Sequence, residues 1–159
     1  MKICPPFENG KRYYPLSQHY RECFGEKVYK VSISVAKSCP NREGLHGTNV
    51  CIFCDEWGSA AYHESSDLPI LKQIQINREA IRKRYKAEKF LIYFQAYTNT
   101  FGNFSSLENL YNKALNEIDV VGLVIGTRPD CLPKRILNKF SELSKNQYLS
   151  VELGAQTFD

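Results

Sequence analysis

The chain has 159 residues and a formal net charge of +4, and 43% of its residues are hydrophobic. This length suits one domain or part of a larger one, and the apolar share is high enough for a folded core, which excludes a wholly disordered protein. No apolar run approaches the roughly 20 residues of a membrane span, and the N-terminal stretch MKICPPFENGKRYYPL has no apolar segment typical of a secretory signal. We therefore expect a cytoplasmic protein without a membrane partner, whose six cysteines stay reduced.

The first predicted strand and the first predicted helix enclose a long loop. Residues 27–35 (KVYKVSISV) alternate and are rich in β-branched side chains, which predicts a strand after an N-terminal extension over residues 1–26. Residues 68–87 have helical periodicity, with Asp67 as the expected cap and Pro69 in the first turn. The expected apolar face of this helix consists of Ile70, Leu71, Ile74, Ile81 and Tyr85.

The rest of the chain repeats a strand and a helix. Residues 89–95, 119–126 and 148–153 are almost continuously apolar, as in strands that are buried on both faces. Ser105 and Glu108 have capping-box spacing at the start of a helix, and a further helix is expected to begin near Pro133. The apolar faces expected of these two helices are Leu107, Leu110, Tyr111, Ala114 and Leu115, and Ile136, Leu137, Phe140 and Leu143.

This alternation predicts an α/β fold with parallel strands and right-handed crossovers. The later strands begin about 30 residues apart, the length of one βαβ unit. Residues 27–159 are therefore expected to form the N-terminal part of a (β/α) TIM-like barrel that is truncated after its fourth strand. We expect such a fragment to be poorly soluble and inactive by itself, because its last strand has no covering helix. Functional residues of parallel sheets gather at the C-terminal ends of the strands.

Three cysteines lie in the loop that follows the first predicted strand. Cys51 and Cys54 form a C-x-x-C pair, and Cys39 lies twelve residues upstream of Cys51. Thiolates are ligands for zinc, copper(I) and iron–sulfur clusters. A structural zinc ion needs four ligands, whereas a cluster that leaves one iron open to a reactant needs only three thiolates. A fourth zinc ligand would have to come from His46, His63, Cys4 or Cys23.

A local basic cluster is the second feature of the sequence. It consists of Arg78, Arg82, Lys83, Arg84, Lys86 and Lys89. Charge runs of this kind usually form the solvated face of a helix, which is the interpretation that we favour. The alternative is a surface that contacts RNA, which together with zinc at the cysteine loop would describe a zinc-bound RNA-binding module without catalysis.

The spacing C-x11-C-x2-C, in the loop after the first strand of a predicted barrel, resembles the radical S-adenosylmethionine superfamily. The commonest spacing there is C-x3-C-x2-C, so the longer first gap indicates a particular branch. From about residue 12 to the end, the chain is similar to the YhcC/YtqA-like group, which is close to the Elongator catalytic-subunit-like radical domains. The segments that carry this similarity are FGEKVYKVSISV, CPNREG, YFQAYTNTF, GLVIGTRPDCL and VELGAQT.

The resemblance implies an enzyme in which Cys39, Cys51 and Cys54 hold a 4Fe–4S cluster. S-adenosylmethionine (SAM) would bind the fourth iron and be cleaved reductively to a 5′-deoxyadenosyl radical. The electron would come from an external donor of the flavodoxin or ferredoxin type. The Elongator-like branch suggests tRNA as the substrate and base modification as the reaction, and the sequence indicates no oligomeric state.

Two groups of residues are implied to contact SAM. Phe53, next to the last ligand cysteine, would lie near the adenine, or else pack in the core. The end of the second strand corresponds to a Gly-Gly-Glu-like stretch that binds the methionine amino group through its backbone. The glycines are absent here, so only the backbone role transfers to Gln95, Ala96, Tyr97 and Thr98.

The ends of the third and fourth strands carry two further expected contacts. Arg128 is expected to form a bidentate pair with a carboxylate of SAM or substrate, or equally with Asp130. Asp130 is otherwise expected to cap the following helix. Glu152 resembles the acidic residue that binds the ribose hydroxyls. Cys131 is expected to be a small buried side chain without a role in the cluster.

Overall fold

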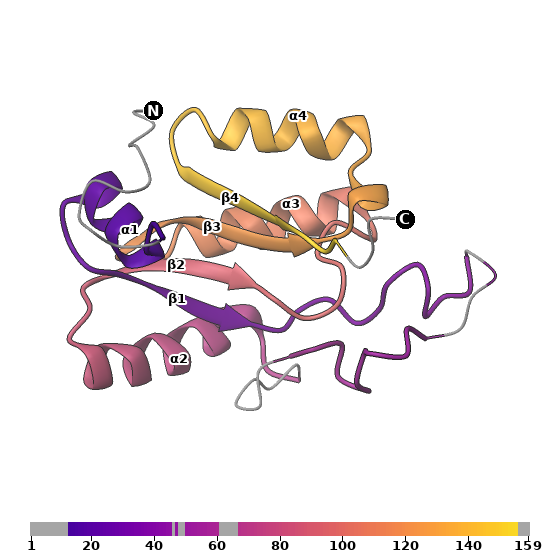
Figure 1. Cartoon of the computed structure of the whole chain (residues 1–159), viewed down its shortest axis with the longest axis horizontal. Helices are drawn as coiled ribbons and strands as arrows, with labels where there is room; N and C mark the ends of the chain where they lie inside the picture. The colour runs from indigo at the N-terminus through magenta and orange to yellow at the C-terminus, as the bar shows by residue number, and fades with distance from the viewer. Residues whose placement is uncertain (1–12, 46, 48–49, 61–66, 156–159) are drawn as a thin grey trace.

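The computed structural model describes residues 13–45, 47, 50–60 and 67–155, and it shows an α/β fold (Figure 1). All four predicted strands are present, and their ends differ from the prediction by at most two residues. The elements run in the order α1 (Leu16–Phe24), β1 (Val28–Ile33), α2 (Ile70–Tyr85), β2 (Lys89–Phe94), α3 (Phe104–Leu115), β3 (Val120–Thr127), the 3-10 helix η1 (Pro129–Cys131), α4 (Lys134–Leu143) and β4 (Tyr148–Leu153).

The four strands form one sheet in the order β1-β2-β3-β4, and every neighbouring pair is parallel. The crossover helices α2, α3 and α4 pack on the same face of this sheet (Figure 1). Apolar side chains of alternate strand positions meet the apolar faces of these helices in the main core. Its most deeply buried members include Val31, Ile33, Ile74, Phe90, Ile92, Phe94, Tyr111, Leu123, Ile125 and Ile136.

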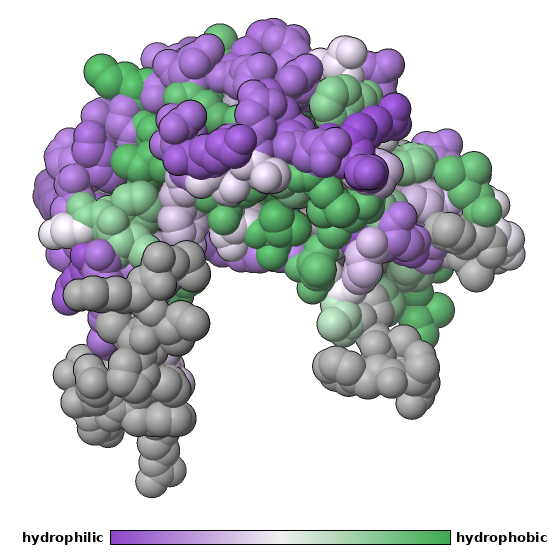
Figure 2. All heavy atoms as spheres, turned by 90° about the horizontal axis from the view of Figure 1, so that it is seen from above, coloured by the Kyte–Doolittle hydropathy of each residue, from purple (hydrophilic) through white to green (hydrophobic). Residues whose placement is uncertain are grey.

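The opposite face of the sheet carries no crossover helix. Helix α1, which the sequence analysis does not predict, covers the beginning of the strands there, where Tyr20 and Phe24 pack against Tyr148. In Figure 2 the largest group of hydrophobic residues lies below the centre of the molecule, whereas the surface nearest the viewer, over α4, is largely hydrophilic. We refer to the face of the sheet opposite α2, α3 and α4 as the open face.

An ion pair on the open face shows that the sheet curves. Lys30 on β1 bonds to Glu152 on β4, although these strands are the two outer strands of the sheet. With adjacent strands about 4.8 Å apart, a flat sheet would separate β1 and β4 by roughly 14 Å. The contact is made because the sheet twists and bends around the open face.

Helix α2 is fixed to the outer edge of β1 by two buried side chains. Gln73 accepts from the backbone N–H of Ser34 (2.9 Å) and donates to its carbonyl (3.0 Å). Asn77 donates to the carbonyl of Ser32 (2.9 Å). These bonds satisfy backbone groups at the point where β1 leads into the cysteine loop, groups that would otherwise be costly to bury.

The predicted helix caps are wrong at all three crossover helices. Helix α2 begins after Pro69 without a side-chain cap, so Asp67 does not cap it. In α3 the cap is Asn103, whose Oδ1 accepts from the N–H of Ser106 (3.1 Å), and Ser105 lies inside the helix. Because Asn103, two positions before Ser105, caps this helix, Ser105 and Glu108 do not form the predicted capping box.

Asp130 does not cap α4 but lies in η1. Helix α4 begins only at Lys134, after Pro133, and no side chain caps it. The helical conformation is disfavoured for the residue before a proline, which separates η1 from α4. Three side chains that were expected on buried helix faces are substantially exposed: Leu71, Tyr85 and Leu137. Each helix contacts the sheet along a narrower stripe than the prediction assumed.

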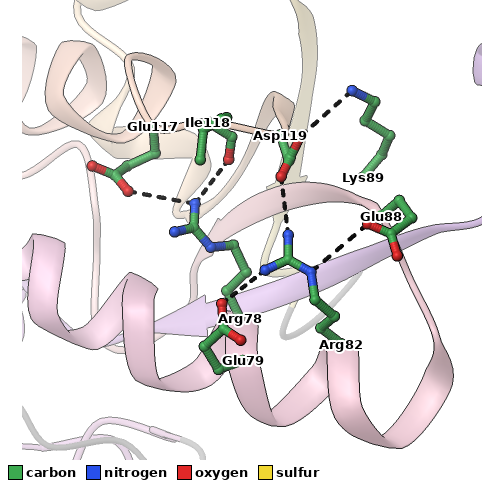
Figure 3. A network of polar contacts seen from close by, with 8 residues as sticks. All are labelled: Arg78, Glu79, Arg82, Glu88, Lys89, Glu117, Ile118 and Asp119. Carbon is green, nitrogen blue, oxygen red and sulfur yellow. Dashed lines mark hydrogen bonds and ion pairs between the residues drawn. The ribbon is translucent and has the colours of Figure 1, made fainter.

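The basic cluster is not a uniformly solvated face (Figure 3). Arg78 is buried, and its Nη1 donates to the carbonyl of Ile118 (2.8 Å) and approaches Glu117 at 3.4 Å. Arg82 bonds to Asp119 (2.9 Å), which also lies 3.7 Å from Lys89. These contacts join the end of α2 to the connection between α3 and β3. Three members of the cluster are exposed: Lys83, Arg84 and Lys86.

No helix in the described part of the chain has the length and apolar character that crossing a membrane requires.

Candidate metal and cofactor site

A cavity of about 470 Å³ lies at the C-terminal ends of the strands. The loop after β1 forms one side of it, and the segments after β2, β3 and β4 form the others, because parallel strands bring these ends to the same edge. Its lining residues include Cys39, Cys51, Phe53 and Cys54 from the cysteine loop, Gln95, Tyr97 and Thr98 after β2, Arg128 and Asp130 after β3, and Gly154 and Ala155 after β4.

All three loop cysteines are free thiols, partly buried, and they line this one cavity. Within the described ranges, no three His, Cys, Asp or Glu side chains are grouped closely enough to hold a metal ion. The loop therefore presents three soft donors to a shared space without arranging them around one point. Metal binding supplies the free energy for such an arrangement when it occurs, and three thiols are a donor set that suits an iron–sulfur cluster.

Two side chains of the cysteine loop contact the sulfur atoms of the C-x-x-C pair. Asn41 Nδ2 lies 3.0 Å from Cys51 Sγ, and Arg42 Nη2 lies 3.5 Å from Cys54 Sγ. Arg42 also donates to the carbonyls of Asp55 and Glu56, the latter at 3.2 Å. The loop is thus closed on itself by residues that directly follow Cys39.

Tyr97 attaches the cysteine loop to the end of β2. Its N–H donates to the carbonyl of Gly58 (2.9 Å), and its hydroxyl donates to the carbonyl of Glu56 (2.9 Å). The Arg42 guanidinium lies 5.1 Å from the centroid of the Tyr97 ring. Gly58 has φ of 65°, and a Cβ at this position would lie 2.3 Å from the Tyr97 ring. The backbone conformation favours a glycine there, and the Tyr97 ring leaves no room for a Cβ.

Asn99 joins the ends of β2 and β3. Its buried amide nitrogen lies within hydrogen-bonding distance of the carbonyls of Phe94 (2.9 Å), Ala96 (3.0 Å) and Gly126 (3.1 Å). The Tyr111 hydroxyl of α3 donates to the Asn99 carbonyl (2.6 Å). The segment that lines the cavity after β2 is therefore held on a rigid support rather than on a free loop.

The predicted SAM contacts fall into two groups. Phe53, Gln95, Tyr97, Thr98 and Arg128 line the cavity together with the cysteines. Ala96 is fully buried and Glu152 lies on the open face, and neither is among the lining residues. The sequence analysis thus predicts most of the lining. It misses Asn41, Arg42, Gly58 and Asn99, whose roles depend on contacts that form only when the loop and the strand ends fold together. The sequence feature that could have singled out Asn41 and Arg42 is the CPNREG segment. It is one of the segments that carry the family resemblance, but its residues alone do not indicate a role.

Arg128 pairs with Asp130, one of the two partners expected for it. The guanidinium donates from Nε (2.9 Å) and Nη2 (2.8 Å) to the two carboxylate oxygens. These hydrogen bonds raise the pKa of Arg128 above its ordinary value. Both residues line the cavity, so the pair places a fixed, partly neutralised cation at its wall.

Glu152 bonds to Lys30 and accepts a hydrogen bond from Tyr93. Burial raises the pKa of Glu152, but the bonds from Lys30 and Tyr93 outweigh this, and the net pKa lies below its ordinary value. The carboxylate is therefore ionised at neutral pH and already has two partners.

Cys131 is buried, and burial is the main cause that raises the pKa of its thiol to about 11. It therefore stays protonated near neutral pH, unlike a metal ligand. Cys23 is exposed on α1, with its sulfur 3.6 Å from His19 Nε2. The other zinc ligands considered above, Cys4, His46 and His63, lie outside the described residues.

Comparison with known proteins finds relatives in bacteria and archaea. The chain is 39% identical to YtqA of Bacillus subtilis over 96% of its own length and 48% of that protein. It is 36% identical to YhcC of Escherichia coli over 84% of the chain and 42% of that protein, and 30% identical to MJ0486 of Methanocaldococcus jannaschii over 95% and 46%. The chain therefore spans about half the length of the curated relatives it matches, and their names state no activity. No family model matches the chain, and no solved structure does.

Proposed function

We propose that the chain carries the cluster-binding and SAM-binding part of a radical SAM enzyme. The observation that supports this most directly is the shared cavity, where three thiols of one loop face the ends of β2, β3 and β4. Three thiolates suit a 4Fe–4S cluster with one iron left for a small-molecule ligand. When bound, the cluster would supply the electron that cleaves SAM to a 5′-deoxyadenosyl radical.

In this proposal Cys39, Cys51 and Cys54 hold the cluster as thiolates. The segment after β2 would bind the amino group of SAM through its backbone, which Asn99 holds in place. Phe53 is 63% exposed and lines the cavity, so its ring is available to pack against the adenine. Arg128 would attract the SAM carboxylate while Asp130 holds its side chain in position.

We also propose that the sheet is part of a (β/α) barrel. Its strands follow chain order, and α2, α3 and α4 cover one face, as the outer helices of a barrel do. A doubly wound sheet would carry helices on both faces. The Lys30–Glu152 pair on the open face supports inward curvature, and residues of staggered register meet inside a barrel.

Anaerobic reconstitution with iron and sulfide tests the proposal. The protein should turn brown, bind about four iron ions per chain, and give the electron paramagnetic resonance (EPR) signal of a reduced 4Fe–4S cluster after addition of dithionite. Addition of SAM should change that signal. Formation of 5′-deoxyadenosine under reducing conditions would then demonstrate cleavage. Colourless protein that binds about one zinc ion would instead support the zinc-bound module.

The zinc-bound module would also need a basic face that binds RNA, and such a face has less support. Arg78, Arg82 and Lys89 are engaged with acidic side chains or backbone carbonyls, which leaves three exposed cations of the cluster. For the enzyme, tRNA remains the proposed substrate on the resemblance to Elongator-like domains, with a flavodoxin or ferredoxin as electron donor. Comparing modified nucleosides in total tRNA from cells with and without the gene tests the substrate.

A further inference from the structure

Asn41 and Arg42 contact the sulfur atoms of two ligand cysteines but are not themselves metal ligands. Asn41 Nδ2 lies 3.0 Å from Cys51 Sγ, and Arg42 Nη2 lies 3.5 Å from Cys54 Sγ. We propose that these two side chains donate N–H···S hydrogen bonds to the cluster thiolates and thereby raise the reduction potential of the cluster. This inference rests on the proposed function.

The backbone of the loop explains how both side chains reach back to the pair. After Cys39 the chain turns sharply, with Glu43 N–H bonded to the Cys39 carbonyl (3.1 Å) and Leu45 N–H bonded to the Pro40 carbonyl (3.0 Å). This turn directs Asn41 and Arg42 toward Cys51 and Cys54. The eleven-residue gap between the first two cysteines provides the room for it. A three-residue gap would have no space for such a turn.

Arg42 is held more firmly than an ordinary surface arginine. Its guanidinium donates to the carbonyls of Asp55 and Glu56 and lies over the Tyr97 ring, so all its contacts favour one position. The planar fork of arginine makes several such bonds at once, and its charge persists at every accessible pH. The positive charge is therefore fixed beside Cys54.

The electrostatic consequence follows from the direction of these bonds. A reduced cluster carries one more negative charge than an oxidised one, and N–H groups aimed at its sulfur ligands stabilise that charge. Hydrogen bonds to the sulfurs and the net charge nearby are among the factors that set the potential of iron–sulfur clusters. Removing either donor should make the cluster harder to reduce.

The test uses anaerobically reconstituted protein and four sequences: the unchanged chain, Asn41→Ala, Arg42→Lys and the control Lys37→Met. Arg42→Lys keeps the charge and loses the fork, and Asn41→Ala removes one neutral donor. Lys37 is exposed and precedes Cys39, and its substitution removes a charge near the loop without removing an N–H···S bond. Iron content is measured first, and the midpoint potential is then measured by redox titration followed by EPR.

We expect a more negative midpoint potential for both loop variants and a smaller change for Lys37→Met, because solvent screens its exposed charge. For Arg42→Lys we expect the midpoint potential to fall by about 59 mV. For one electron, this shift changes the ratio of oxidised to reduced cluster tenfold at a fixed applied potential. Because the signal comes only from protein that holds a cluster, incomplete loading of a variant does not affect the result. Equal midpoints in all four proteins would overturn the inference and leave the proposed function intact. Absence of iron from the unchanged chain would instead overturn the proposed function.

Discussion

Lys30 and Glu152 form a hydrogen-bonded ion pair across the open face of the sheet, although they lie on its two outer strands. Tyr93, on β2 between them, holds both partners, since its ring lies 4.6 Å from the Lys30 ammonium and it hydrogen-bonds to Glu152. Glu152 is therefore oriented by two neighbours before any ligand approaches. A role in binding ribose would require the sugar hydroxyls to share or displace these partners.

The ion pair makes stability depend on pH. The pKa of Glu152 is lower in the folded protein than its ordinary value in the unfolded chain. The ion pair therefore stabilises the fold fully above the unfolded pKa, and this stabilisation is lost as pH falls through the folded pKa. Glu152→Gln should therefore lower the free energy of unfolding at pH 7, by about 0.2–1 kcal/mol for a partly exposed pair. The difference from the unchanged chain should shrink as pH falls below the ordinary carboxyl range and through the folded pKa. Urea unfolding at pH 7 and at an acidic pH below that range measures this, and an equal difference at the two pH values would contradict it.

Gly58→Ala should disrupt the attachment of the cysteine loop to β2. The added Cβ would meet the Tyr97 ring at 2.3 Å, in addition to the strain of a positive φ. Gly44→Ala is the matched control, because Gly44 has φ of 71° and a Cβ added there would meet no atom within 4 Å. The control should lose about 1 kcal/mol of stability from backbone strain alone, and Gly58→Ala should lose more. Thermal unfolding and proteolysis of the loop compare them; equal losses would show that the Tyr97 contact is unimportant.

Arg78→Leu should destabilise the fold, whereas Arg84→Leu should not. Arg78 is buried and bonded to the carbonyl of Ile118, so its removal leaves that acceptor and Glu117 without this partner (Figure 3). The expected loss is about 1–3 kcal/mol. Arg84 is exposed on the same helix, and its substitution should change stability by less than about 0.5 kcal/mol. Chemical denaturation of both variants provides the measurement, and similar effects would refute the structural role of Arg78.

Replacing Cys39, Cys51 or Cys54 by Ala should abolish assembly of the cluster, because each removes a thiol that lines the cavity. Cys131→Ala should leave iron content unchanged, since that thiol is buried and its pKa is raised to about 11. Alkylation with iodoacetamide at pH 8 should accordingly modify the loop cysteines faster than Cys131. Full iron loading of Cys51→Ala would show that the ligand assignment is wrong.

Local sequence pattern was sufficient to predict the four strands and the three crossover helices. The continuous apolar runs of β2, β3 and β4 and the helical periodicity between them have few alternative structures that bury the same side chains. The same alternation predicted that Cys54, Tyr97 and Arg128 would share one edge, because parallel strands leave their C-terminal ends together. These predictions needed only the order of the elements along the chain.

The partners of individual polar side chains were decided by the tertiary structure. Arg78 looks like a member of a solvated charge run, yet it is buried where the connection between α3 and β3 passes it and the Ile118 carbonyl accepts its hydrogen bond. Glu152 has a partner from β1, more than a hundred residues away in the chain, because the sheet curves. Arg42 reaches Cys54 because the loop turns back after Cys39. A hydrogen bond depends on the distance and direction between two groups, and sequence spacing determines neither once the groups lie on different elements.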